Sequence, residues 1–421
     1  MLSMNVESFR ERHPSNYTLI EDGRLAILRY AAILGPNASG KSNLLRAIGA
    51  IKWMILSSSG RKEGQSIPPY EPFLLSESGS RCPVALEIEF VVPSGTRYRY
   101  EISFSNDRVE EERLYSFSRR SRATVFSRNS DDTWETIKFG STYKGGNRKF
   151  PFFRNAAYLS RAGNDASSPY FIREIYDYFE KMKIISSEFV GDSFFSRSDL
   201  DNRELSAISK IIRLADTGVE RVTIEDNKFA KDVRLPEGIP EELKKMIIDQ
   251  NRKVTKYWIL SQFKELVAFD ARDMSQGTVQ LYKILPIFLS VLRAGSVLIF
   301  DEIDVHFHKD LVALLLRLFR DNQINLAGAQ MIFSTHDTTI LDSSYIRRDQ
   351  VWLASKKNGA SSLRSLDEYD KKHVRHDSSF ESLYRNGRLG ALPRVSYLSL
   401  KRAVLDALER NNPVDEGEGD A

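Results

Sequence analysis

The strongest local signal in the sequence is the stretch Gly35-Pro-Asn-Ala-Ser-Gly-Lys-Ser42. It follows the apolar run Ala31–Leu34 and precedes a helical pattern that extends to about Leu56. A pattern G-x-x-x-x-G-K-[ST] between a buried strand and a helix predicts a phosphate-binding loop, because loop N–H groups and the helix N-terminus both favour an anion. An ordinary glycine-rich turn is the alternative, and it leaves the flanking strand and helix unexplained.

Two side chains of this loop carry specific expectations. Lys41 should reach the β- and γ-phosphates of ATP, and it is also a catalytic candidate. The Ser42 hydroxyl should bind Mg²⁺. The other nucleotide-binding candidates share the loop or the first turn of its helix: Gly35, Pro36, Asn37, Ala38, Ser39, Gly40 and Asn43.

A second signal lies 260 residues after Lys41, where the apolar run Val297–Phe300 ends in Asp301 and Glu302. Open α/β sheets place their sites at the carboxyl ends of strands. We expect Asp301 to hold Mg²⁺, partly through water, and Glu302 to orient or deprotonate the attacking water. Strands often end in acids, so this signal gains its weight from the phosphate-binding loop.

Two further features flank these acids. Ser275 and Gly277 open a helical pattern, with Ser275 26 residues before Asp301, and a helix N-terminus of this kind is a second anion site. His336 follows the strand pattern 330–334 and lies 35 residues after Asp301, where an imidazole can contact a γ-phosphate.

Taken in this order, the four features resemble an ABC-type ATPase. The resemblance implies that Ser275 and Gly277 form the signature motif, although Gln276 and Thr278 depart from the usual LSGGQ. It also implies that Asp304 belongs to the D-loop and that His336 is the switch histidine. The Q-loop glutamine is not placed. The cofactors implied are ATP and Mg²⁺.

Longer segments resemble the short SMC/RecF-related and OLD-related ATPases of bacterial anti-phage systems, such as the RloA and AbiL ATPases and the AriA subunit of PARIS. The segments are GPNASGKSNLLRAI, SQGTVQLYKILP, DEIDVHFHKDLVALLLRLF, GAQMIFSTHDTTILD and YRNGRLGALP. The resemblance covers residues 1–105 and 259–395.

That family implies an ATP-hydrolysing sensor or scaffold that assembles as head-to-tail homo-oligomers. Such a subunit holds and releases a separate nuclease or toxin effector, with nucleic acid or a phage protein as the trigger. The alternative is a RecF- or SMC-like DNA-repair ATPase that acts directly on DNA. A transporter ATPase is disfavoured by the long insertion.

The alternation of strands and helices predicts an α/β fold with a parallel sheet. The resemblance implies an ABC-type ATPase head, with a mixed or parallel sheet and flanking helices. We expect an N-terminal lobe at 1–106, a basic and then mainly helical insertion at 107–258, a C-terminal lobe at 259–412, and an acidic disordered tail at 413–421. The predicted strands are 4–9, 25–34, 84–92, 97–104, 296–300 and 330–334, with a hairpin at 219–229. The predicted helices are 42–56, 170–185, 203–215, 241–251, 276–292 and 311–322.

Composition excludes some classes. The net charge of +4 is too small alone to indicate a nucleic-acid binder. No stretch approaches the length of a membrane helix. Cys82 is the only cysteine, which fits a reducing cytoplasm.

Several weaker patterns have ordinary explanations. Residues 113–161 hold 11 Lys/Arg against 3 Asp/Glu, which indicates either a nucleic-acid or acidic-partner surface or a solvated face. Asp199 and Asp201 form a D-x-D pattern that we interpret as a helix cap rather than a nuclease site. A metal pair formed by His306 and His308 is disfavoured, and His308 is interpreted as packing at the start of the next helix. The aromatic run 170–179 is interpreted as helix core. The basic side chains considered are Arg119, Arg120, Arg122, Arg128, Lys144, Arg148 and Lys149.

Overall fold

The fold is taken from a computed structural model. It describes residues 1–7, 13–20, 25–75, 79, 82–118, 121–186, 200–215, 217–227, 252–342, 345–370, 374, 379–390 and 396–409. Among these, no helix is both long and apolar enough to cross a membrane.

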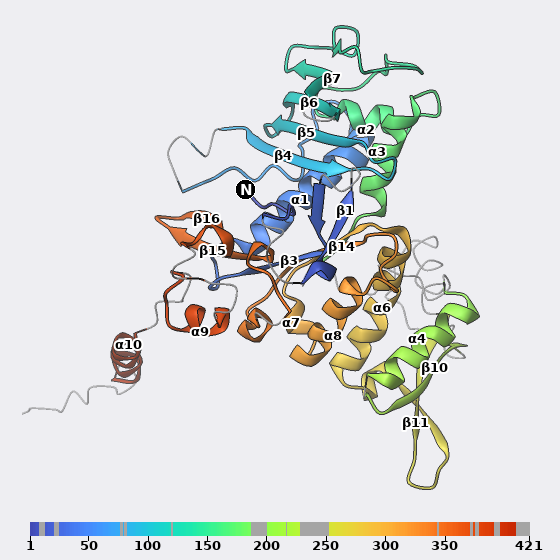
Figure 1. The fold of residues 1–421 in the computed structure, drawn as a ribbon, viewed down its shortest axis with the longest axis vertical. Coiled ribbons are helices and arrows are strands. Elements are labelled where there is room, and N and C mark those ends of the chain that lie inside the picture. The colour runs from blue at the N-terminus through green and yellow to red at the C-terminus, as the bar shows by residue number, and fades with distance from the viewer. Residues whose placement is uncertain are drawn as a thin grey trace, which may run out of the picture.

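A six-stranded sheet forms the centre of the molecule (Figure 1). Its order is β16-β15-β3-β14-β13-β9, and the neighbours from β15 to β9 pair in parallel. Only β16 pairs antiparallel. The strands are β3 (Tyr30–Leu34), β9 (Lys183–Ile185), β13 (Val297–Phe300), β14 (Gln330–Ser334), β15 (Val351–Lys357) and β16 (Ala360–Ser365).

Both faces of this sheet are covered, which explains why its inner strands are apolar throughout. In β3, Ala32 and Leu34 face one apolar core, while Ala31 and Ile33 face the other. Helices α6 (Gln276–Ala294) and α8 (Lys309–Arg320) pack in the first core, and α1 (Lys41–Leu56) packs in the second. The sheet is therefore packed on both faces, which holds its strands and the loops at its edge in place.

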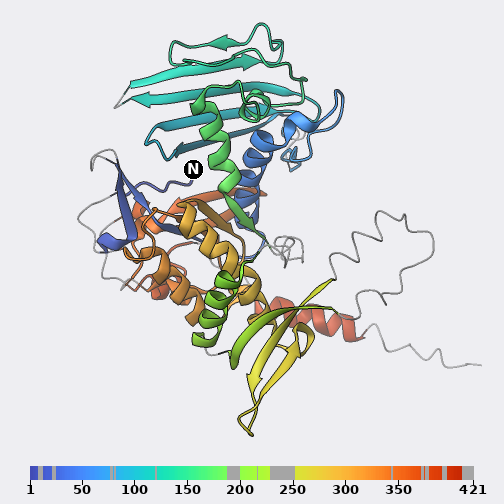
Figure 2. The same ribbon diagram turned by 90° about the vertical axis from the view of Figure 1, so that its right-hand side faces the viewer.

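A second, antiparallel sheet lies at one end of the molecule in both views (Figures 1 and 2). It runs in simple order from β4 to β8, and its inner face packs with α1, α2 and α3 in the second core. The elements are β4 (Val84–Val91), β5 (Arg97–Phe104), β6 (Val109–Ser118), β7 (Ser121–Asn129), β8 (Lys138–Phe139), α2 (Tyr158–Gly163) and α3 (Tyr170–Lys181).

At the opposite end lies a three-stranded antiparallel sheet (Figure 2). It consists of β10 (Val219–Asp226), β11 (Lys253–Leu260) and β12 (Leu266–Asp270), and helix α4 (Asn202–Leu214) packs beside it. The remaining elements are β1 (Tyr17–Ile20), β2 (Leu25–Leu28), α7 (Ile303–His306), α9 (Phe380–Arg385) and α10 (Tyr397–Glu409), with 3-10 helices at 14–16, 58–60, 271–273, 338–341, 348–350 and 366–368.

These elements confirm the predicted α/β fold class with its parallel sheet and correct parts of the expected organisation. Residues 107–258 hold strands as well as helices where described: β6, β7 and β8 lie in the basic first part, and β9 and β10 accompany α2, α3 and α4 in the later part. The predicted boundary after residue 106 falls between the paired strands β5 and β6, and the boundary after residue 258 falls inside β11. Both boundaries of the predicted insertion therefore fall within β-sheets rather than between separate domains.

Several predicted elements also differ in detail. The strand predicted at 25–34 is divided at Arg29, because β2 pairs with β1 whereas β3 joins the central sheet. The helix predicted at 170–185 ends at Lys181, and its last residues form β9. The predicted hairpin at 219–229 is a single strand paired with β11. The strand predicted at 4–9 is reduced, in its described part, to a bridge at Asn5.

Helices or strands were otherwise found where expected: 42–56, 84–92, 97–104, 203–215, 276–292, 296–300, 311–322 and 330–334 correspond to α1, β4, β5, α4, α6, β13, α8 and β14. The helix predicted at 241–251 and the tail at 413–421 lie outside the described residues.

Candidate functional site

The carboxyl ends of three parallel strands bring the predicted site residues to one edge of the central sheet. The phosphate-loop motif follows β3, Asp301 and Glu302 follow β13, and His336 follows β14, which lies between the other two strands. Residues separated by up to 301 positions, from Gly35 to His336, are thus placed at one edge by strand pairing alone.

The loop between β3 and α1 has a backbone that depends on glycine. Gly40 has φ 98°, and Ala38 also lies in the left-handed region with φ 58°. A Cβ atom on Gly40 would lie 2.3 Å from Ser361 Oγ of β16, and one on Gly35 would lie 2.4 Å from the Ala354 carbonyl oxygen of β15. The loop is therefore pressed against β15 and β16 and has no room for larger residues.

Lys41 lies at the first position of α1 with its side chain buried. Its Nζ donates to the carbonyl oxygens of Gly35 (2.9 Å) and Pro36 (3.1 Å), which lie in the same loop. Burial lowers the pKa of Lys41, while the carboxylates of Glu302 and Asp301 oppose that shift. The ammonium group is therefore held inside the loop within the electrostatic reach of the acids after β13.

Asp301 is buried, and its Oδ1 accepts a hydrogen bond from the hydroxyl of Ser334, the last residue of β14. The backbone N–H of Glu302 donates to the same hydroxyl oxygen at 2.7 Å. Glu302 itself has a left-handed backbone, with φ 53° and ψ 55°, which is uncommon for a residue other than glycine. The two acids are thus fixed by one serine.

His336 approaches the second acid from β14. Its Nε2 lies 4.0 Å from Glu302 Oε1, and both side chains are about one-third exposed, at 33% and 32%. The backbone N–H of His336 lies 3.2 Å from each carboxylate oxygen of Asp304. Asp304 therefore ties the segment after β14 to α7, and an imidazole and a carboxylate face solvent together at this edge.

The fit of a Mg–nucleotide complex rests on the loop and these acids. No side chain caps the N-terminus of α1, so its first N–H groups remain available to phosphate oxygens. Over the described ranges, no group of three or more His, Cys, Asp or Glu side chains is placed to hold a metal ion. Mg²⁺ bound with a nucleotide takes one or two protein oxygens and completes its shell with phosphates and water. Ser42 and Asp301 are the residues that would hold it.

The signature residues are arranged differently. Ser275 caps α6, with its Oγ accepting from Thr278 N–H at 3.2 Å and lying 2.8 Å from Thr278 Oγ1. A Cβ atom on Gly277 would meet no atom of the described residues within 4 Å. The packing of the described part of the protomer thus gives no reason for glycine at this position, and it leaves space for an approaching group.

The remaining loop candidates, Asn37, Ala38 and Asn43, are exposed, whereas Ser39 is buried. Asn43 Oδ1 accepts from Arg46 Nη2 at 2.6 Å.

Sequence reasoning missed two parts of this edge. Ser334 was read only as strand, although a polar residue that ends a buried strand beside an Asp-Glu pair is a usable signal. Strand β9 is three residues long and lies beside β13, and its Ile185 carbonyl accepts from Asp301 N–H at 2.8 Å. The chain after β9 therefore leaves the sheet at the same edge, and it passes out of the described residues after Ser186.

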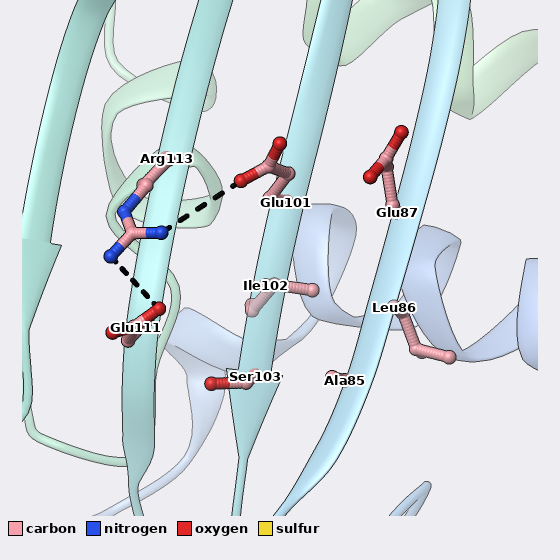
Figure 3. A pocket seen from close by; sticks show the side chains of 8 residues that line it. All are labelled: Ala85, Leu86, Glu87, Glu101, Ile102, Ser103, Glu111 and Arg113. Atoms are coloured by element: carbon pink, nitrogen blue, oxygen red, sulfur yellow. Dashed lines mark ion pairs between the residues drawn. The ribbon is translucent and has the colours of Figure 1, made fainter.

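A depression of about 310 Å³ lies elsewhere, on the outer face of strands β4, β5 and β6 (Figure 3). Glu101 and Glu111 line it, and both pair with Arg113, at 4.0 and 3.0 Å (Figure 3). Arg113 is the one basic residue in a lining that also holds Glu87, and the predicted nucleotide-site residues are absent from it.

The weaker patterns mostly have structural roles. Asp201 Oδ1 accepts from Glu204 N–H at 2.7 Å and so caps α4, as predicted, while Asp199 lies outside the described residues. His308 caps α8. The run 170–179 lies in α3 and contributes Ile172, Ile175 and Phe179 to the core, whereas Tyr170 is 69% exposed, so the prediction of an aromatic helix core holds only in part.

Among the described basic candidates, Arg128 is buried and the other four are exposed. Arg128 is buried and pairs with Glu112 at 2.8 Å, so it is not available to a nucleic acid. The guanidinium of Arg122 lies over the Tyr115 ring, and that of Arg148 over the Tyr143 ring. Lys144 and Lys149 are exposed, and Arg119 and Arg120 lie outside the described residues.

The family can now be stated. The profile of the family described as "AAA domain, putative AbiEii toxin, Type IV TA system" matches residues 31–342, which include the loop, both acids and His336. The chain belongs to this AAA domain family. A comparison with curated proteins found no match.

Solved structures similar to this AAA domain protein include SMC heads. An SMC head bound to the C-winged helix domain of ScpA is 14% identical, with a TM-score of 0.35 over 81% of this chain and 91% of that one. The SMC head domain from Thermotoga maritima is 14% identical, with a TM-score of 0.32 over 83% of this chain and 95% of that one. UvrA2 from Deinococcus radiodurans is 18% identical, with a TM-score of 0.19 over 44% of this chain and 22% of that one.

Proposed function

We propose that this protein hydrolyses ATP with Mg²⁺ at the edge formed by β3, β14 and β13. The observation that carries the proposal is the convergence of Lys41, Asp301 and Glu302 with His336 on neighbouring parallel strands. These are the parts that phosphoryl transfer needs, namely a phosphate cradle, a metal ligand and a group that orients water.

Each residue has a distinct role in this proposal. The loop from Gly35 to Ser42 and the Lys41 ammonium bind the phosphates, and Asp301 with Ser42 binds the cation, which neutralises charge on the phosphates when bound. Glu302 orients the attacking water and accepts its proton. His336 contacts the terminal phosphate in this proposal. Its Nε2 lies 4.0 Å from Glu302 Oε1, so a phosphate whose attacking water contacts Glu302 would also lie close to His336.

We infer that two copies associate head to tail when ATP is bound. The N-terminus of α6 at Ser275 adds anion affinity only where it meets a phosphate, and the open space at Gly277 suits an incoming group. Asp304 lies beside His336 and would join the same interface. Ser275, Gly277 and Asp304 would then contact the nucleotide of the partner subunit.

For the biological role, we propose a sensor or scaffold subunit of a bacterial anti-phage system that holds and releases a separate nuclease or toxin. The family description, which names a putative toxin of a type IV toxin–antitoxin system, supports a role of this kind. A nucleic acid or a phage protein would act as the trigger.

Two assays test this function. Purified protein should release phosphate from ATP only with Mg²⁺, and Lys41→Ala should abolish both nucleotide binding and turnover. Cells that carry the protein with its neighbouring genes should resist phage, and Lys41→Ala should remove that resistance. Tight, salt-dependent binding of DNA together with unchanged phage sensitivity would instead favour a DNA-repair ATPase.

A further inference from the structure

Ser334 occupies the last position of β14 and contacts both candidate acids with one hydroxyl. Its side chain is fully buried, at 0% exposure. The hydroxyl donates to Asp301 Oδ1 and accepts the backbone N–H of Glu302 at 2.7 Å. The single donor of the hydroxyl and one of its two acceptor lone pairs are therefore used at the site.

The bond to Glu302 supports a strained backbone. Glu302 has φ 53° and ψ 55°, a region that L-residues other than glycine rarely adopt. Its carbonyl accepts from Val305 N–H at 3.0 Å, so the peptide groups on both sides of this residue are held. Because the backbone sets the direction of Cβ, the Ser334 bond helps to set the direction in which the Glu302 side chain leaves the main chain.

The bond to Asp301 orients the other acid. Donation to Oδ1 fixes the plane of the carboxylate and directs its second oxygen, and hydrogen bonds of this kind tune metal-binding carboxylates. Ser334 also lies two residues before His336, whose N–H contacts Asp304. A shift at the end of β14 is thus transmitted directly to both acids of β13.

We propose that Ser334 is a positioning residue for ATP hydrolysis, which holds Glu302 in its left-handed conformation and orients Asp301 toward the cation. This role rests on the proposed ATPase function. It predicts that the hydroxyl, rather than the volume of the side chain, is what turnover requires.

The test compares Ser334→Ala, which removes the hydroxyl, with Ser334→Thr, which keeps it in a residue that strands favour. We expect Ser334→Ala to lower kcat about 10- to 100-fold, the usual effect of losing a partner of a metal-binding or catalytic carboxylate. Affinity for ATP without Mg²⁺, measured with a fluorescent analogue, should be unchanged because the loop is untouched. Ser334→Thr should recover most of the kcat.

Ser296→Ala is the matched control. Ser296 is buried just before β13, at the other end of the same strand pair, and its hydroxyl contacts no hydrogen-bonding partner among the described residues. The Ser296→Ala variant should hydrolyse ATP with the kcat of wild type.

Three outcomes overturn the inference. If Ser334→Ala keeps the wild-type kcat, while wild type hydrolyses ATP and Glu302→Gln does not, the positioning role of Ser334 is overturned and the proposed ATPase function is not. Parallel loss of kcat and of Mg-free ATP affinity, without recovery in Ser334→Thr, would show a general structural role. Absence of hydrolysis in wild type would overturn the proposed function and this role with it.

Discussion

Replacing Gly40 with alanine should disable the phosphate-binding loop for two separable reasons. Gly40 has φ 98°, where an added Cβ costs about 1–3 kcal/mol. The added Cβ would also lie 2.3 Å from Ser361 Oγ and 2.8 Å from Ser361 Cβ, and overpacking of this kind costs about 1–3 kcal/mol. Gly40→Ala should therefore lower the free energy of unfolding by about 2–6 kcal/mol and weaken nucleotide binding.

Urea unfolding and binding of a fluorescent ATP analogue measure the two effects. Gly64→Ala is the control for backbone strain alone, because Gly64 has φ 76° with nothing near its Cβ position. Ser361→Gly removes the steric contact, so the double variant with Gly40→Ala should recover about 1–3 kcal/mol. Strictly additive effects of the two substitutions would refute the packing of β16 on the loop.

Three further predictions concern other parts of the chain. Ser275→Arg should block ATP-dependent association in size-exclusion chromatography while monomer nucleotide binding persists, and loss of binding itself would contradict a role in the partner's site. Glu112→Ala should cost about 3–5 kcal/mol in urea unfolding, because it leaves the buried Arg128 charge without its 2.8 Å partner, and a cost below about 1 kcal/mol, the range of an exposed pair, would contradict this. Burial lowers the pKa of Lys52 to about 8 from 10.5, so between these values the unfolded chain binds more protons and stability rises with pH. Lys52→Met should thus stabilise the fold by about 1–2 kcal/mol at pH 7, after allowance for solvent screening. This gain should shrink toward pH 10, where the lysine is neutral in the folded chain. A gain independent of pH would show that burial of the Lys52 charge is not its cause.

The sequence predicted the two halves of the candidate site well because each is contiguous. The loop at Gly35–Ser42 and the acids after Val297–Phe300 each carry a strand, a turn and polar residues within a few positions. Once both strands are parallel neighbours of β14, their carboxyl ends must meet. The sequence therefore predicted which residues gather, although not the atoms that hold them.

The rest depended on contacts between distant segments. Strands β6 and β7 carry many charged residues on an open face and contain a register shift near Leu114, so their period-two pattern is interrupted. The fold buries Glu112 and Arg128 as a pair, whereas charged residues in a sequence usually indicate an exposed surface. Strand β9 has three residues, and its hydrogen bonds in the sheet are made to β13, which is distant in the sequence. No local pattern predicts such elements.

Glu302 is proposed to activate water for ATP hydrolysis at this edge of the sheet. The most direct measurement is the nucleotide retained by Glu302→Gln after incubation with ATP and Mg²⁺, identified by chromatography of the denatured protein. The claim predicts that this variant retains ATP, since its phosphate and metal ligands remain, whereas wild type retains ADP. Retention of ADP by Glu302→Gln, with turnover at the wild-type rate, would contradict it.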